Sequence, residues 1–122
     1  MALYGGFYYV SKLYKFDDNM AYVKGHKGAS WAPKANYYIG VIYYQREDYP
    51  KAQEAFTQLL TDYPTCQHAA KGLVYWEGAA EYNHDWGSAR TALDRYIEEY
   101  PDGEDIDLMK KRSEMLKYRH GQ

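Results

Sequence analysis

A spacing of 37 residues recurs along this chain and constrains its fold more than any other feature of the sequence. Matched pairs with that spacing are Asp48-Tyr49 with Asp85-Trp86, Ala52 with Ala89, Phe56 with Leu93, and Tyr63-Pro64 with Tyr100-Pro101. A fixed period of this length indicates a repeated supersecondary unit, because each unit leaves an apolar face that its neighbour has to cover. The sequence therefore predicts a stack of similar units.

Residues 33–64 show what one unit contains. A first helix is predicted over about 30–46 and a second over 49–62, from apolar residues that recur at helical spacing. Gly40 lies on the first helix and Phe56 on the second. Small residues let two helix axes approach closely, and aromatic side chains fill the wider space beside them. Each unit is therefore predicted to be a helical hairpin.

The remaining segments extend this pattern in both directions. At 122 residues, the chain is long enough for one domain with a continuous core. The predicted division is a degenerate hairpin at 1–29, repeat units at 30–64 and 65–101, and a capping helix at 102–122. A stack needs such an end element, with one apolar side and one polar side.

Local signals predict where helices begin and how they align. Asp17 or Asp18 is the expected N-cap of a short helix in the first hairpin, and Ser30 is the expected N-cap of the next helix. In the second unit the first helix is expected over about 67–83. Gly78 stands one position late relative to Gly40, which predicts a small register shift there.

Composition argues against several function classes. The net charge of −2 does not suit a nucleic-acid binder, which would present a strongly basic face. Cys66 is the single cysteine and no metal-ligand spacing occurs, so no disulfide, metal or cofactor is expected. No stretch approaches the ~20 apolar residues of a membrane span. No signal-peptide pattern occurs, so a periplasmic location would require that an export signal has been removed, and the location is otherwise expected to be cytoplasmic.

Residues 33–101 resemble the tetratricopeptide repeat (TPR) family, most closely in the unit at 30–64. The matching residues are Ile39, Gly40, Tyr43, Ala52, Phe56, Leu59 and Pro64, whereas Asn36 stands where a tryptophan is usual. The long spacing and the Tyr-Pro ends are similar to bacterial cell-envelope TPR proteins, namely the Tol–Pal-associated coordinator and the lipoprotein of the outer-membrane assembly machine. The resemblance implies an all-α, right-handed helical-hairpin solenoid with a C-terminal capping helix. It also implies a scaffold role without catalysis.

The resemblance further implies where a partner protein or peptide would bind, because TPR arrays use the inner face of each first helix. The residues expected on that face are Lys34, Tyr37, Val41, Tyr44, Gln45, Lys71, Val74, Gly78, Glu81 and Tyr82. Tyrosine is favoured at interfaces, and this chain has 16 tyrosines. A groove lined by these tyrosines is expected to hold an extended or helical peptide. The alternative is that they pack against the neighbouring unit.

Two other functions stay open from the residues alone. The aromatic N-terminal helix, which contains Phe7 and Val10, would make the chain a structural subunit of a larger assembly or a homo-oligomer. Cys66 and His68 would form a nucleophile pair if the fold brought them together with an orienting group. The preferred prediction is a scaffold that is not an enzyme.

Overall fold

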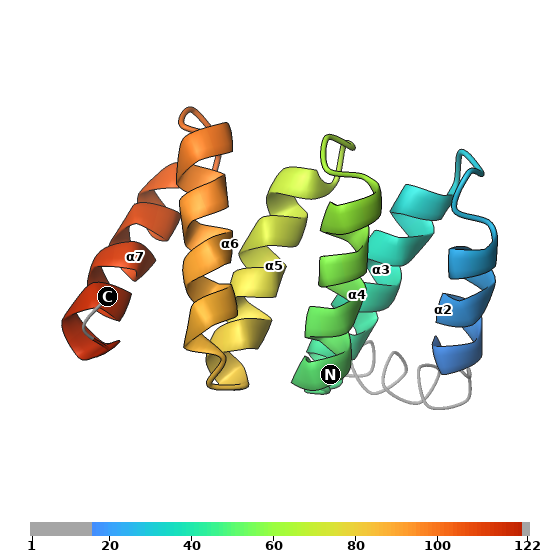
Figure 1. Ribbon diagram of the computed structural model, residues 1–122, viewed down its shortest axis with the longest axis horizontal. Helices are drawn as coiled ribbons and strands as arrows, with labels where there is room; N and C mark the ends of the chain where they lie inside the picture. Colours follow the sequence, from blue (N-terminus) through green and yellow to red (C-terminus); the bar gives the residue numbers. More distant parts are fainter. Residues whose placement is uncertain (1–15, 121–122) are drawn as a thin grey trace, which may run out of the picture.

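The computed structural model describes residues 16–120, and that part of the chain is helical and contains no strand. Its helices are α2 (Phe16–Gly25), α3 (Ala32–Gln45), α4 (Tyr49–Asp62), α5 (Ala69–Tyr82), α6 (Trp86–Glu99) and α7 (Ile106–His120). They lie side by side in chain order, from α2 at the right of Figure 1 to α7 at its left. The predicted all-α, TPR-like solenoid is confirmed. The helix predicted over residues 1–15, with Phe7 and Val10, lies outside the described residues.

The helices form two antiparallel hairpins, α3–α4 and α5–α6, flanked by α2 and α7 (Figure 1). α4 and α6 lie in front of α3 and α5 in this view, so the helices alternate between two layers. α4 packs against both α3 and α5, and α3 also contacts α5 directly. The first helices of the two hairpins therefore share one layer, which is where a common binding face can form.

The repeat has a constant register, and the predicted shift in the second unit is wrong. α3 and α5 both contain 14 residues, and they begin at Ala32 and Ala69, 37 positions apart. The turns inside the hairpins also match, because Glu47 and His84 both adopt a left-handed backbone, with φ of 62° and 57°. No residue is inserted between the units, so Glu77 and not Gly78 takes the position of Gly40.

The helix caps differ from the predicted ones. Asp85 is the N-cap of α6, and its carboxylate accepts a hydrogen bond from the Ser88 backbone N–H at 3.2 Å. Ser30 is not a cap. Tight turns continue through residues 26–32, so α3 begins only after Trp31. Trp31 makes no side-chain capping bond. The N-cap predicted at residues 17–18 is also wrong, since both residues lie inside α2.

The core runs between the two layers. A methyl group added to Gly40 would lie 2.7 Å from the buried Phe56 ring, and one added to Gly72 would lie 2.9 Å from Leu59. Gly40 thus brings α3 onto α4, as predicted, and Gly72 brings α5 onto the same helix. Each α-carbon without a side chain lets the neighbouring helix approach closely.

α7 stands where the first helix of a third unit would lie, since Ile106 follows Ala69 by 37 positions. Met109 and Leu116 are buried on its inner side, together with Ser113. The residues expected on its polar side, Lys110, Lys111, Glu114 and Lys117, are all exposed. α7 thus packs one buried side onto the second hairpin, as predicted for the capping helix. Its exposed surface is mixed, because Leu108, Met115 and Tyr118 are exposed as well as the charged residues.

Candidate functional site: the inner-face hollow

Residues from three helices enclose a hollow of about 300 Å³ on the layer of first helices. Its lining, termed here the inner-face hollow, is Tyr44 of α3, Glu77, Gly78, Glu81 and Tyr82 of α5, and Arg112 of α7. A smaller hollow of about 130 Å³ continues from it along α7 and shares Glu81 and Arg112. Four of the residues predicted for partner binding therefore meet at one place.

Glu77 is the buried charged group of this site. Its side chain has no exposed surface, and its Oε1 accepts a hydrogen bond from Nη1 of Arg112 at 2.8 Å. Burial raises the pKa of Glu77 to about 8. A side-chain hydrogen bond with the Glu81 carboxyl and the negative charge of Glu81 add to this rise, while Arg112 opposes it. At neutral pH the Glu77 carboxyl is therefore largely protonated.

Tyr44 and Tyr82 form one wall of the hollow. The Tyr44 hydroxyl lies over Gly78, so that a methyl group there would come within 2.9 Å of it. Tyr82 is 60% exposed, and its ring stacks on Tyr49 with the centroids 4.3 Å apart. Burial raises the pKa of the Tyr44 hydroxyl, which stays a neutral hydrogen-bonding group. The wall thus offers an aromatic surface with a polar edge.

An aromatic ladder continues from this wall into the interface between the hairpins. Tyr75 lies edge-on to Tyr44 at 5.2 Å and stacks on Phe56 at 5.5 Å. Tyr37 follows edge-on to Tyr75 and stacks on His68 at 4.6 Å. This ladder fixes the two hairpins relative to each other, and it is the packing alternative that the sequence left open.

The other predicted residues spread along the same layer. Tyr37 is 8% exposed and serves the aromatic ladder. Val41 and Val74 are half-buried and pack against the core, whereas Lys34 and Gln45 are exposed at the two ends of α3.

Lys71 is exposed and bound to the segment that precedes α7. Its ammonium group lies 2.9 Å from the Asp105 carboxylate and 3.4 Å from that of Glu104, and these partners raise the pKa of Lys71. Its place is thus the junction of α5 with α7, outside the inner-face hollow.

Glu77 and Arg112 were missed by sequence reasoning, as was Tyr75. The 37-residue spacing contained a signal for two of them. Tyr75 lies 37 positions after Tyr38 and is again a tyrosine, and Glu77 occupies the position that matches Gly40. A glutamate in place of a close-approach glycine marks a change of local chemistry. Nothing in the spacing pointed to Arg112, because its contact with Glu77 joins positions 35 residues apart.

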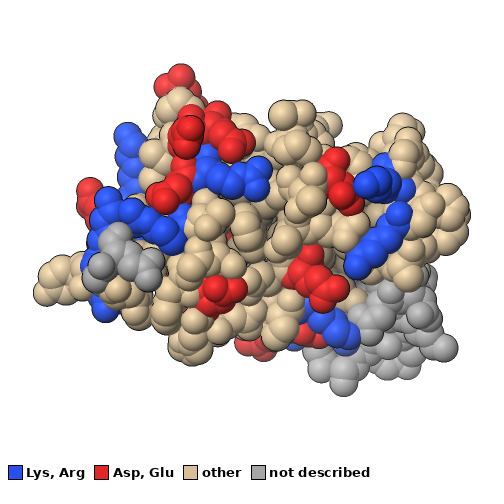
Figure 2. Space-filling view, in the orientation of Figure 1, with Lys and Arg blue, Asp and Glu red and all other residues tan. Residues whose placement is uncertain are grey.

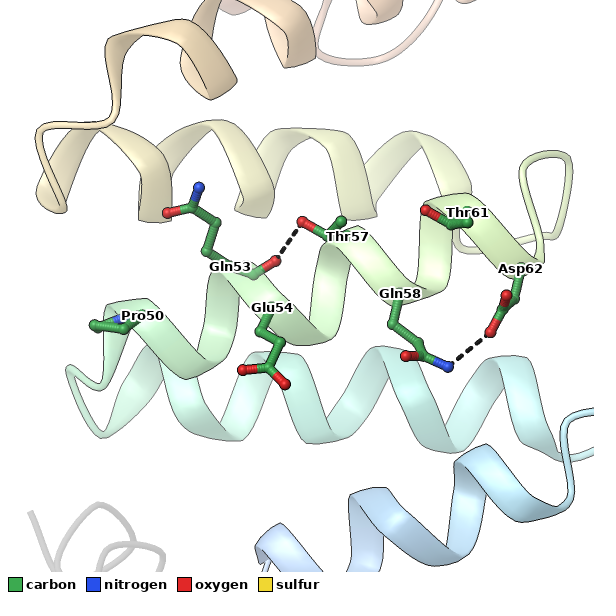
Figure 3. Close-up of a pocket in the computed structure, with 7 residues that line it drawn as sticks. All are labelled: Pro50, Gln53, Glu54, Thr57, Gln58, Thr61 and Asp62. Carbon is green, nitrogen blue, oxygen red and sulfur yellow. Dashed lines mark hydrogen bonds between the residues drawn. The ribbon is translucent and has the colours of Figure 1, made fainter.

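A second hollow lies on the outer face of α4 and has no such buried group (Figure 3). It is lined by Pro50, Gln53, Glu54, Thr57, Gln58, Thr61 and Asp62. Thr57 donates to the Gln53 carbonyl oxygen at 2.8 Å, and Gln58 donates to Asp62 at 2.7 Å. These bonds lie within one helix. Acidic and basic side chains are interspersed on the face seen in Figure 2, without a field of one sign.

Metal-ligating side chains do not gather in the described part of the chain. Residues 16–120 contain no group of three or more His, Cys, Asp or Glu side chains placed to hold a metal ion. His68 stacks on Tyr37, and Cys66 is half-buried in the preceding turn. The described helices include none that is both long and apolar enough to span a bilayer.

Comparison with known proteins identifies the family. No curated protein matches the chain. The model of the YfiO family, described as an outer membrane lipoprotein, matches residues 30–110. The match covers both hairpins and the beginning of α7, which is about two thirds of the chain. This chain therefore belongs to the YfiO outer membrane lipoprotein family, a TPR-like family of the bacterial envelope.

Proposed function

We propose that this protein is a non-catalytic scaffold that binds a partner protein or peptide on its inner, tyrosine-rich face within a bacterial envelope complex. The observation that carries the proposal is the inner-face hollow, where side chains of α3, α5 and α7 converge. Tyr82 is 60% exposed at its rim, although a ring of this size stabilises a fold mainly when buried. Exposed aromatic side chains beside a polar hollow are typical of protein-binding surfaces.

The family match supports the envelope part of this proposal. Its description names an outer membrane lipoprotein, and the matched residues include the whole inner face of α3 and α5. Within that setting, we favour a role in outer-membrane assembly over one in a Tol–Pal complex. The inner-face residues named from the sequence remain the proposed binding residues, with Tyr44, Glu81 and Tyr82 as the centre.

A pull-down from envelope and cytosolic fractions tests the proposal. The test variant is Tyr82→Ala, and the matched control is Tyr22→Ala on α2. The two tyrosines are 60% and 59% exposed, and each contacts two neighbouring rings, Tyr49 and Tyr44 for Tyr82, and His26 and Trp31 for Tyr22. Both variants are checked for helix content by circular dichroism. The changes remove the same aromatic side chain from α5 and from α2, which lie in different parts of the array.

We expect Tyr82→Ala to lose the partner and Tyr22→Ala to retain it, with the partner coming from the envelope fraction. Loss with Tyr22→Ala alone would place the interface near α2 and favour the structural-subunit alternative. Retention by both variants would contradict binding at the inner-face hollow.

A further inference from the structure

The inner-face hollow contains two carboxyl groups and one guanidinium group. Glu77 has no exposed surface, and Arg112 binds only its Oε1. Glu77 also shares a side-chain hydrogen bond with the Glu81 carboxyl, and no N–H group or hydroxyl of another described residue donates to its buried Oε2. Glu81 is half-buried beside it. The site therefore holds two carboxyl groups and one guanidinium group, and at neutral pH a proton held between the carboxyls balances the second negative charge.

The groups around Glu77 come from each helix that packs on it. Tyr44 faces it from α3, Glu81 from α5 itself, and Arg112 from α7. On α6, Arg90 is bound to Asp94 and to the Ser113 hydroxyl, and Arg95 is bound to Glu99. Among the described residues, Arg112 is thus the cation bound to this pair of acids. Burial and the hydrogen bond with Glu81 raise the pKa of Glu77, so a proton stands where a second positive charge could bind.

We propose that the inner-face hollow receives a lysine or arginine side chain of the bound partner, whose positive charge completes the pair of acids. This inference rests on the proposed function and specifies the partner's chemistry. The incoming cation would displace the proton held between Glu77 and Glu81 and pair with the two carboxylates, with the Tyr44 and Tyr82 rings beside it. Such rings attract cations through their π-faces. A charge-assisted hydrogen bond to Oε2 would also satisfy that buried acceptor.

The hollow has the size for this ligand, since about 300 Å³ exceeds the volume of one long side chain. An organic cation fits the lining better than a metal ion does. Arg112 already occupies one oxygen of Glu77, and two tyrosine rings form the rest of the wall. A metal ion would need several more oxygen ligands.

A matched pair of peptides tests the inference. The probes are acetyl-Gly-Arg-Gly-amide and the same peptide with citrulline, which has the shape of arginine without its charge. Each is titrated into the ¹⁵N-labelled chain and followed by NMR. We expect the arginine peptide to shift the amide signals of Gly78, Glu81 and Tyr82 and to bind about tenfold more tightly than the citrulline peptide.

Variants define the site. Glu81→Gln is expected to weaken binding of the arginine peptide by about tenfold. The control Glu54→Gln, on the outer face of α4, removes an equal charge and leaves the affinity unchanged. Affinity is also expected to rise with pH as Glu77 loses its proton, and Glu77→Gln removes that rise.

Equal affinity for the two peptides, or shifts confined to other helices, would overturn the inference. The absence of shifts at millimolar peptide would also overturn it. If that failure is found while Tyr82→Ala still loses the natural partner, the inner face binds that partner without a basic anchor and the proposed function stands. If the arginine peptide binds in the hollow but Tyr82→Ala retains the partner, the basic-side-chain site stands and the proposed function fails.

Discussion

The two hairpins have the same length and spacing, but they differ in chemistry where the first helix meets the second. In α3–α4, Gly40 lies against the ring of Phe56, which is fully buried. In α5–α6 the same positions hold Glu77 and Leu93, also fully buried. The position in the first hairpin is apolar and allows close approach of the helices. The matching position in the second hairpin holds a buried carboxyl group, which needs a hydrogen-bond partner.

This difference shows how a repeat can change its function without changing its backbone. Leucine is smaller than phenylalanine, and the second hairpin holds a side chain where the first has only glycine. The longer side chain then requires a hydrogen-bond donor, and α7 supplies Arg112 at 2.8 Å. A packing position in the first unit thereby becomes part of the inner-face hollow in the second.

The largest expected effect concerns Glu77. Its pKa of about 8 in the folded chain exceeds its ordinary value of 4.5, so the folded state holds a proton that the unfolded state releases. The contribution of the protonated Glu77 carboxyl to the free energy of unfolding is therefore fully present below about pH 4.5 and is lost as the pH rises through about 8. Between about pH 5.5 and about pH 8.5 the wild type should lose on the order of 3 kcal/mol more than Glu77→Gln does.

Urea unfolding followed by circular dichroism at several pH values measures this effect. Glu54→Gln serves as the control, because that carboxylate is largely exposed, with 72% of its side-chain surface accessible. Its pH profile should follow that of the wild type. If the stability of the wild type and that of Glu77→Gln changed in parallel with pH, the Glu77 carboxyl would not have the raised pKa on which this prediction depends.

The next effect separates the two glycines that the sequence suggested were equivalent. Gly40→Ala places a methyl group against the fixed Phe56 ring, and should cost about 1–3 kcal/mol. Gly78→Ala meets only the end of the Tyr44 side chain, which can turn away. The gain of about 1 kcal/mol in helix propensity should offset that movement, leaving the net stability nearly unchanged.

Thermal or urea unfolding of the two variants gives this comparison directly, and the tyrosine signal in near-ultraviolet circular dichroism reports whether Tyr44 has moved. Equal destabilisation by Gly40→Ala and Gly78→Ala would mean that both glycines mark close helix approach. The constant register of the repeat would then be in doubt.

The smallest effect compares the helix caps of the two hairpins. Asp48 accepts one capping bond at 3.4 Å, whereas Asp85 accepts a shorter one and also a bond from Gln53 Nε2 at 2.6 Å. The bond from Gln53, joined by the cap, lowers the pKa of Asp85. Asp85→Ala should cost about 1–2 kcal/mol, and Asp48→Ala about 0.5–1 kcal/mol.

Urea unfolding measures the loss of unfolding free energy for each variant, and the two losses are compared. Glu98→Ala, on the exposed side of α6, is the control. A larger cost for Asp48→Ala would contradict the cross-hairpin role of Gln53. The lowered pKa of Asp85 also predicts a pH dependence. The stabilisation that the Asp85 carboxylate gives the fold is present at neutral pH and is lost as the pH falls through the folded-state pKa of Asp85.

Much of the fold could be predicted because its signals are local. The helix at Tyr49–Asp62 was predicted at its observed bounds, since Pro50 marks its first turn and Pro64 follows its end. The cap predicted at Ser30 was wrong, because the chain still forms tight turns at this residue and the helix begins later. The predicted binding residues lie on α3 and α5, which contact each other in one layer, and their role in binding stays a prediction. Local signals could not tell that Tyr37 would be buried.

The sequence by itself determined the repeat, the hairpins and the capping helix, because periodic apolar positions and helix-end residues act within a few turns of the chain. Only the tertiary structure decided the chemistry of the inner-face hollow. The contact of Glu77 with Arg112 and that of Tyr44 with Gly78 join different helices. Whether such groups meet depends on how the hairpins stack. The shift of the Glu77 pKa depends on the burial that results.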